Sequence, residues 1–275
     1  MYGLTEGGGG FNTRIMSTES TRALAPDVRN KMSETTAQII ERVGLIPVLR
    51  ARNAAQAHAV VKAMIAGGVT VVEVTMTVPG AIEVIGELKK EYGTSLLLGA
   101  GTVTTAVEAE ATIDAGAEFI VSPSFHPEVV AATKARKKLS IPGALTPTEA
   151  ITASEAGADY VKIFPCSAVG GASYLKSLLA PFPQLKLIPT GGVTLATAES
   201  FLRAGARALG VGSELVNLAA IDAGTPETIT ETARAYLQVL AKFREEGIQK
   251  MECNGEEKIK VAGALNSMRN GAPAK

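Results

Sequence analysis

Short apolar runs alternate with amphipathic segments along most of this chain. Each run is followed by a segment in which apolar residues recur at helical spacing. Strands that alternate with helices predict a parallel sheet, and eight such pairs predict an α/β fold, a (β/α)₈ TIM barrel. The predicted strands cover residues 46–50, 71–77, 96–100, 119–122, 140–142, 160–164, 186–189 and 208–211.

Residues that start and end helices stand where this pattern requires them. Asn53 precedes the helical segment 54–66, and Thr146 with Pro147 precedes the segment 148–155. Their side-chain oxygens suit the position before a helix, and proline suits the first turn.

An open, doubly wound sheet is the alternative architecture. The barrel is favoured because no junction between a strand and a helix carries the glycine fingerprint of dinucleotide-binding folds.

A short glycine-containing repeat marks the C-terminal end of four predicted helices. Ala-Gly-Gly or Ala-Gly-Ala occurs just before a predicted strand at 66–68, 115–117, 156–158 and 204–206. Glycine there accepts the left-handed conformation that ends a helix.

The barrel is expected over residues 34–247 as a single domain. Residues 1–33, with a glycine tract at 7–10, are expected to form a flexible N-terminal extension, and residues 248–275 a flexible C-terminal tail.

Charge and composition narrow the classes of partner. Lys plus Arg and Asp plus Glu both number 27, so neither nucleic acid nor a membrane surface is an expected partner. The two cysteines and two histidines are not at metal-ligand spacing. The chain has neither an apolar span of membrane length nor a signal-peptide profile. These features predict a cytoplasmic protein with no bound metal.

Two charged residues are predicted to point into the barrel. Val72, Val74, Met76 and Val78 occupy one face of the strand, while Glu73, Thr75 and Thr77 occupy the other. Because the outer face of a barrel strand packs against helices, the polar face must point inward. The same alternation places Lys162 inside. Burial favours the neutral amine, which is the form that attacks a ketone to give a Schiff base. A structural ion pair between Lys162 and Glu73, or a solvated lysine, is the alternative.

Glycine-rich segments follow the last two predicted strands, at 189–193 and 210–213. Loops at these positions of a barrel commonly direct backbone amides and a helix N-terminus at a phosphate. Glycine allows the backbone to approach closely. The segments therefore predict a phosphate site, and tight turns without a ligand are the alternative.

Several motifs together resemble one enzyme family over residues 46–216. They include Val-Leu-Arg at 48–50, Glu-Val-Thr at 73–75, Gly-Ala-Gly-Thr-Val at 99–103, Val-Lys-Ile-Phe-Pro at 161–165 and Pro-Thr-Gly-Gly-Val at 189–193. In this order and spacing the sequence resembles the KDPG/KHG aldolases. These class I enzymes act on 2-keto-3-deoxy-6-phosphogluconate (KDPG) or 4-hydroxy-2-oxoglutarate (KHG).

The resemblance implies a role for each matching residue. Lys162 is the Schiff-base lysine and Glu73 the general acid/base. Substrate contacts are implied for Arg50, Thr77, Thr102, Pro123 and Phe164, and phosphate contacts for Gly191, Gly192, Gly212 and Ser213. Thr77 stands where many members carry an arginine that holds the substrate carboxylate. The resemblance also implies a homotrimer that acts on small 2-keto acids and aldehydes without a cofactor.

Other functions remain open at this point. The galactonate epimer of KDPG is an alternative substrate, and a phosphosugar isomerase would share the glycine-rich loops. Isomerases generally need a pair of acid/base residues rather than an inward lysine. A non-catalytic barrel that serves as an assembly subunit is a further alternative. Such a subunit need not preserve Lys162 and Glu73, yet the chain has both.

Overall fold

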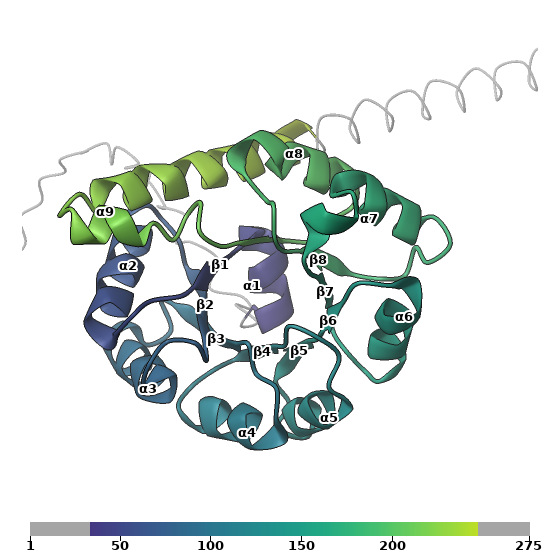
Figure 1. The fold of residues 1–275 in the computed structure, drawn as a ribbon, viewed down its shortest axis with the longest axis horizontal. Helices are drawn as coiled ribbons and strands as arrows, with labels where there is room; N and C mark the ends of the chain where they lie inside the picture. Colours follow the sequence, from purple (N-terminus) through teal and green to yellow (C-terminus); the bar gives the residue numbers. More distant parts are fainter. Residues whose placement is uncertain (1–33, 247–275) are drawn as a thin grey trace, which may run out of the picture. The chain divides into compact units, whose positions relative to one another are not determined.

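The computed structural model describes residues 34–246, and the extensions predicted at 1–33 and 248–275 lie outside them. The described residues form a ring of parallel strands surrounded by helices (Figure 1). The strands are β1 Leu45–Leu49, β2 Val71–Thr75, β3 Leu97–Gly101, β4 Phe119–Val121, β5 Leu139–Ile141, β6 Gly143–Ala144, β7 Val161–Ile163, β8 Leu187–Pro189 and β9 Leu209–Val211.

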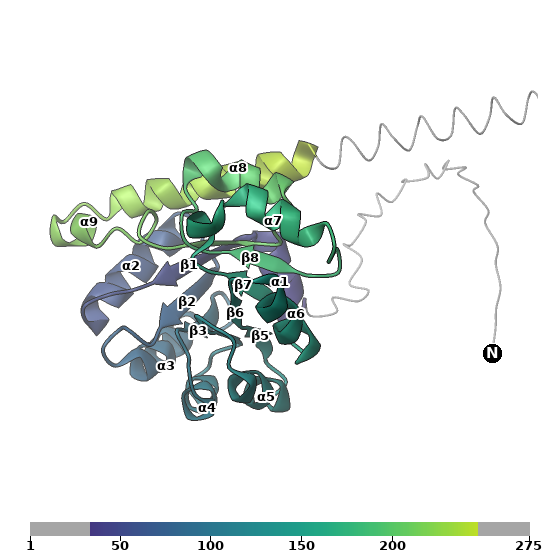
Figure 2. The ribbon, with the colours of Figure 1, turned by 45° about the vertical axis from the view of Figure 1, so that its right-hand side comes forward.

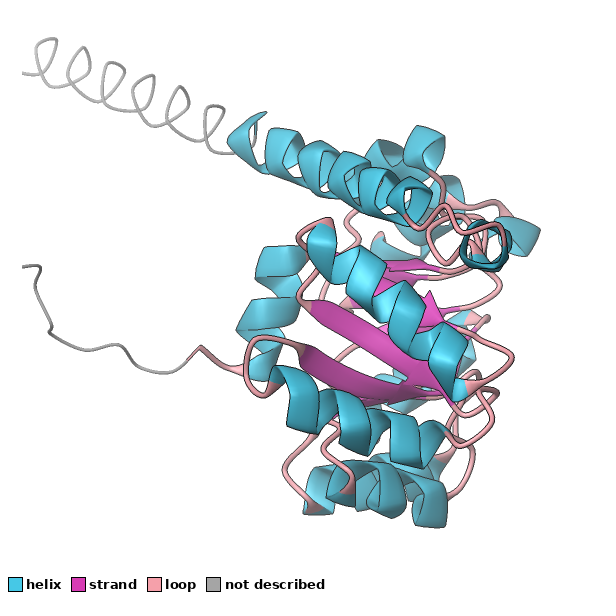
Figure 3. Ribbon diagram, turned by 90° about the vertical axis from the view of Figure 1, so that its left-hand side faces the viewer, coloured by secondary structure: helices cyan, strands magenta, loops and turns pink. Residues whose placement is uncertain are grey.

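The outer helices connect successive strands, apart from a last one that follows β9 (Figures 2 and 3). They are α2 Ala54–Ala66, α3 Ala81–Tyr92, α4 Ala106–Asp114, α5 Pro127–Ala135, α6 Pro147–Glu155, the 3₁₀ helix η1 Cys166–Val169, α7 Ala172–Leu179, α8 Leu195–Arg203 and α9 Leu218–Asp222. A further helix covers residues 227–246. In this part of the chain, no helix combines the length and the apolar composition that a membrane crossing requires.

Strand pairing closes the barrel. One sheet has the order β5-β4-β3-β2-β1-β9 and the other β6-β7-β8, and every pair is parallel. Thr190 pairs with Gly210, which joins β8 to β9. At the other junction Pro142 separates β5 from β6. Proline has no amide hydrogen for the ladder, but its carbonyl accepts the Lys162 amide at 2.9 Å. With β5 and β6 taken as one interrupted strand, the eight-stranded prediction is confirmed.

The residues that the sequence places at helix starts and helix ends occupy those positions in the structure. Asn53 caps α2 by accepting the Gln56 amide at 2.8 Å. Thr146 and Glu149 form a capping box at the start of α6. One glycine in each of the four repeats has a positive φ, of 95°, 117°, 95° and 102° at residues 68, 116, 157 and 205. These positions reverse the chain from a helix into the next strand.

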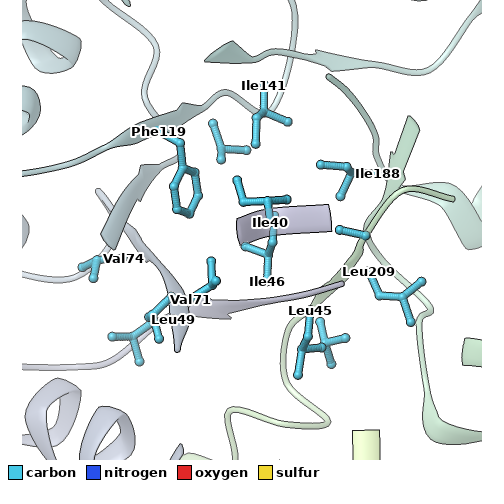
Figure 4. Close-up of a cluster of buried hydrophobic side chains, with 14 of the residues drawn as sticks. Ile40, Leu45, Ile46, Leu49, Val71, Val74, Phe119, Ile141, Ile188 and Leu209 are labelled. Carbon is cyan, nitrogen blue, oxygen red and sulfur yellow. The ribbon is translucent and has the colours of Figure 1, made fainter. Parts of the chain in front are cut away.

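One helix closes the end of the barrel from which the strands start. α1, Thr36–Val43, comes directly before β1, and its Ile40 is fully buried among Ile46, Phe119 and Ile188 (Figure 4). The Tyr160 hydroxyl donates to Glu41 Oε1 at 2.8 Å and so ties this helix to β7. Because α1 fills this end, a ligand must approach from the carboxyl ends of the strands.

Candidate active site

Glu73 and Lys162 meet inside the barrel, as the alternation of side chains predicts. Glu73 lies on β2 and Lys162 on β7, and the Glu73 Oε1–Lys162 Nζ distance is 3.7 Å. Their side chains are 3% and 5% exposed. Charged side chains are seldom buried to this degree unless they pair or act chemically. The pair therefore combines a base and an amine in a space nearly free of solvent.

A glycine on the neighbouring strand makes room for this carboxylate. A Cβ atom added to Gly101 would lie 1.9 Å from Glu73 Oε1 and 2.5 Å from its Cδ. Among the described residues, Glu73 Oε1 is a buried oxygen with no hydrogen-bond partner. A buried acceptor without a partner is costly. Glu73 thus has an open acceptor position beside the lysine amine.

Phe164 connects the lysine to a cleft at the mouth of the barrel. Lys162 Nζ lies 5.3 Å from the centroid of the Phe164 ring, a distance suited to a cation–π contact. Phe164 in turn lines a cleft of about 190 Å³. The cleft is also lined by Arg50, Thr190, Gly191, Gly192, Gly212, Ser213 and Glu214.

Arg50 lies where this cleft meets a second, wider one. The wider cleft, about 390 Å³, shares Val48, Arg50, Gly212 and Ser213 with the first and extends to Leu218 at the start of α9. Within residues 34–246, no carboxylate forms an ion pair with Arg50. A guanidinium in this position can bind a carboxylate through two parallel hydrogen bonds.

The glycine-rich loops after β8 and β9 lie side by side at the cleft. Gly191 and Gly192 have φ values of 86° and 78°. A Cβ on Gly192 would lie 2.3 Å from the Ser167 Cβ. Both positions therefore require glycine, and both residues line the cleft. Gly212 and Ser213 line the same cleft.

The structure places the remaining predicted residues around the rim. Thr102 follows β3 and has a φ of 58°, a left-handed conformation that costs a threonine about 1 kcal/mol or more. Pro123 packs against Gly143, where an added Cβ would lie 2.3 Å from the Pro123 carbonyl oxygen. Neither residue lines the two clefts described above.

Thr77 lies beyond the end of its predicted strand. β2 ends at Thr75, and the Val78 amide donates to the Thr75 carbonyl in the turn that follows. The Thr75 hydroxyl donates to the Leu49 carbonyl at 2.8 Å, so the 2.6 Å contact between the two threonine hydroxyls uses the proton of Thr77. In this arrangement Thr77 has no proton left for a substrate carboxylate.

Two other polar residues near the site have structural roles. Burial raises the pKa of the Cys166 thiol to about 11, which keeps it protonated. His126 stands at the N-cap of α5, and its Nε2 lies 2.9 Å from the Ser124 hydroxyl. Across residues 34–246, His, Cys, Asp and Glu side chains form no group of three or more that could hold a metal ion.

The sequence assigns no individual role to two of the lining residues. Thr190 is 5% exposed and sits between the lysine strand and the glycine loop. Glu214 directly follows the predicted phosphate ligand Ser213, yet its position depends on contacts with distant segments. A polar residue next to Gly212-Ser213 is the signal that could have pointed to it.

Comparison with known proteins gives a consistent family assignment. The sequence model described as KDPG and KHG aldolase matches residues 36–232. A 2-dehydro-3-deoxy-phosphogluconate aldolase of Treponema pallidum is 35% identical over 207 residues, which cover 75% of this chain and 98% of that protein.

Solved structures agree in fold. The Legionella pneumophila KDPG aldolase, with pyruvate captured as a covalent carbinolamine, matches with a TM-score of 0.68 and 32% identity, over 73% of this chain and 97% of the other. A cube-shaped protein cage designed by fusing symmetric oligomeric domains matches with a TM-score of 0.72 and 31% identity, over 83% of each chain.

Proposed function

Since this chain belongs to the KDPG and KHG aldolase family, we propose that it is a class I aldolase that cleaves KDPG to pyruvate and glyceraldehyde 3-phosphate. The same site would cleave KHG to pyruvate and glyoxylate. The observation that carries this proposal is the Lys162–Glu73 pair, with 3.7 Å between Nζ and Oε1. An amine and a carboxylate at this separation supply the nucleophile and the proton carrier of a Schiff-base reaction.

In the proposed reaction, the Lys162 ammonium transfers a proton to the Glu73 carboxylate, and the resulting neutral amine attacks the C2 ketone to form a carbinolamine. Glu73 donates a proton to the departing hydroxyl, and water leaves to give an iminium ion. Glu73, now a carboxylate, accepts the proton of the C4 hydroxyl, directly or through a water. The C3–C4 bond breaks, its electron pair moves into the iminium, and the aldehyde is released with an enamine left on Lys162.

Protonation of the enamine at C3 and hydrolysis of the iminium then release pyruvate and the free lysine. Arg50, which lines the cleft, would bind the keto-acid carboxylate, and Thr102 and Pro123, which follow β3 and β4, would contact the same part of the substrate. Phe164 would pack against the C3 methylene of the substrate. Gly191, Gly192, Gly212 and Ser213 would hold the phosphate, a role supported by their common place on the cleft wall.

We further propose that the protein is a cytoplasmic homotrimer, in which each barrel is catalytic and is joined to the extensions 1–33 and 248–275. Its partners are small 2-keto acids and aldehydes, with no nucleic acid or membrane among them, and it uses no cofactor. The galactonate epimer of KDPG is an alternative substrate, because both epimers have the same reacting atoms and the same phosphate.

The deciding experiment is reductive trapping. The protein is incubated with pyruvate and sodium borohydride, and its intact mass is measured beside Lys162→Met. We expect a pyruvate adduct in the wild type alone, mapped to Lys162 by peptide mass. Cleavage of KDPG and its galactonate epimer is then compared. An adduct on another lysine, or unchanged turnover by Lys162→Met, would exclude the proposed mechanism.

The likeness to a designed cage favours one second candidate, a barrel used as an assembly subunit. A folded wild-type protein that gives neither adduct nor cleavage would support this candidate. Circular dichroism and size-exclusion chromatography on the same sample establish that the protein is folded and assembled.

A further inference from the structure

Glu214 extends from the loop after β9 to the first turn of α8. Its Oε1 accepts the Leu195 amide at 3.1 Å, and its Oε2 accepts the Tyr236 hydroxyl at 2.6 Å. Tyr236 is fully buried on the helix of residues 227–246. Burial raises the pKa of Tyr236, and the hydrogen bond to Glu214 raises it further. The Tyr236 hydroxyl therefore remains a donor at every physiological pH. The carboxylate is therefore held at both oxygens.

The start of α8 differs from the anion site that the sequence indicates. A helix N-terminus attracts phosphate through amides that have no acceptor within the helix. Here Glu214 occupies the Leu195 amide. The Thr194 amide donates to Thr197 Oγ1 at 2.8 Å, and the Thr197 amide donates to Thr194 Oγ1 at 3.3 Å. Three amides of this turn are thus already satisfied by side chains.

Glu214 also changes the charge of the cleft. Arg50 and Glu214 are the two charged side chains on the wall of the smaller cleft, which also includes Gly191, Gly192 and Ser213. A phosphate bound to these loops would share a small, partly enclosed space with the carboxylate. Like charges in such a space repel one another, and salt screens them less than on an open surface.

We propose that Glu214 is a specificity-determining residue that reduces the preference of the enzyme for phosphorylated over unphosphorylated 2-keto-3-deoxy sugar acids. This inference rests on the proposed aldolase function. Glu214 reduces the net gain from binding a phosphate, because its carboxylate repels the phosphate and occupies an α8 amide. Tyr236 is a positioning residue that keeps the carboxylate at the cleft.

The test uses two substrates that differ only in the phosphate, KDPG and 2-keto-3-deoxygluconate. The ratio of their kcat/KM values is measured for the wild type and for Glu214→Gln, whose amide oxygen can still accept the Leu195 amide. We expect the ratio to rise about tenfold in the variant, as removal of a nearby like charge predicts, and the rise to shrink as ionic strength increases.

Binding of inorganic phosphate provides a measurement that does not depend on turnover. By isothermal titration calorimetry, Glu214→Gln is expected to bind phosphate about tenfold more tightly than the wild type. Glu199→Gln is the matched control, because Glu199 lies on α8 and pairs with Arg203 outside the cleft. The control should leave both the ratio and the phosphate affinity unchanged.

The outcomes separate this inference from the proposed function. A pyruvate adduct on Lys162, with a substrate ratio and a phosphate affinity that Glu214→Gln does not change, would overturn the role of Glu214 and leave the aldolase intact. An equal change in Glu199→Gln would also overturn it, because the effect would then follow net charge alone. Absence of both adduct and cleavage would contradict the proposed function, whereas the calorimetry would still test the charge effect.

Discussion

Glu73 and Lys162 approach to 3.7 Å from opposite strands of the barrel. β2 pairs with β1 and β3, whereas β7 pairs with β6 and β8, so the two strands lie across the interior from each other (Figure 1). Their separation is set by closure of the whole ring rather than by a local motif. A change that loosens the ring should therefore reduce activity before it unfolds the protein.

Loss of the Glu73 proton acceptor should slow catalysis while the lysine is retained. We expect Glu73→Gln to lower kcat for KDPG cleavage by about 10²- to 10⁴-fold, the usual contribution of a general acid/base. Borohydride trapping of pyruvate on Lys162 should still occur, but more slowly. A coupled assay of pyruvate release gives kcat. Near-normal turnover would show that another group carries the proton.

The space beside Glu73 can be tested at Gly101. In Gly101→Ala the new Cβ would lie 1.9 Å from Glu73 Oε1, so the carboxylate must move. We expect kcat to fall about a hundredfold, as misplacement by about 1 Å can produce, and unfolding free energy to fall by about 1–3 kcal/mol. Steady-state kinetics and thermal denaturation give the two values.

Gly86→Ala is the matched control for this change. Gly86 lies inside α3, where an added Cβ would be 3.9 Å from its nearest neighbour, the Ala115 carbonyl oxygen. Alanine in a helix interior is favoured over glycine by about 0.5–1 kcal/mol. This variant should be slightly more stable and fully active. Equal loss of activity in both variants would argue against a specific effect on Glu73.

The capping box of α6 should make stability depend on pH. Hydrogen bonds from the Leu145 and Thr146 amides hold the pKa of Glu149 below its ordinary value of 4.5. A carboxyl with a lowered folded pKa stabilises the protein above the unfolded pKa, and this contribution is lost as pH falls through the folded value. The difference in Tm between wild type and Glu149→Gln should therefore shrink below pH 4.5.

Because Glu149 is exposed, its contribution at pH 7 should be only a few tenths of a kcal/mol. Glu155→Gln, at the last residue of the same helix, removes an equal charge away from these amides. Its Tm difference from the wild type should not show the same decline on the acid side. A parallel decline would attribute the effect to net charge.

Cys166 should be inert in the folded protein. With a pKa of about 11, only about one thiol in a thousand is ionised at pH 8, and the thiolate is the reactive form. In a Cys253→Ser background, Ellman's reagent should label Cys166 rapidly only after denaturation. Labelling of the native protein at the rate of a free thiol would show that the residue is accessible.

The sequence predicts the ring and its inward charges because alternation is a local signal. Val72 and Val74 face the helices, so Glu73 must face the interior, and Lys162 follows from the same rule on β7. Asn53 and Thr146 cap helices at the positions expected. The interruption at Pro142 could also be anticipated, since a residue without an amide hydrogen ends a ladder.

Local sequence patterns do not predict contacts between segments that are distant in the chain. Glu214 is held by residues 195 and 236, and no spacing within one element relates these three positions. The Thr77 hydroxyl is directed at Thr75 by a turn that begins where the predicted strand was expected to continue. The burial of Ile40 depends on closure of a ring formed by the rest of the chain.

The position of α1 has a consequence for the order of events in turnover. Since Ile40 and its neighbours fill the barrel below the lysine, the part of the chain that the structure describes leaves the site open only toward the carboxyl ends of the strands. In the proposed reaction, the half of the substrate bonded to Lys162 would lie deeper than the half beyond the broken bond. The aldehyde would therefore depart first and pyruvate second, and in the synthetic direction pyruvate would bind before the aldehyde.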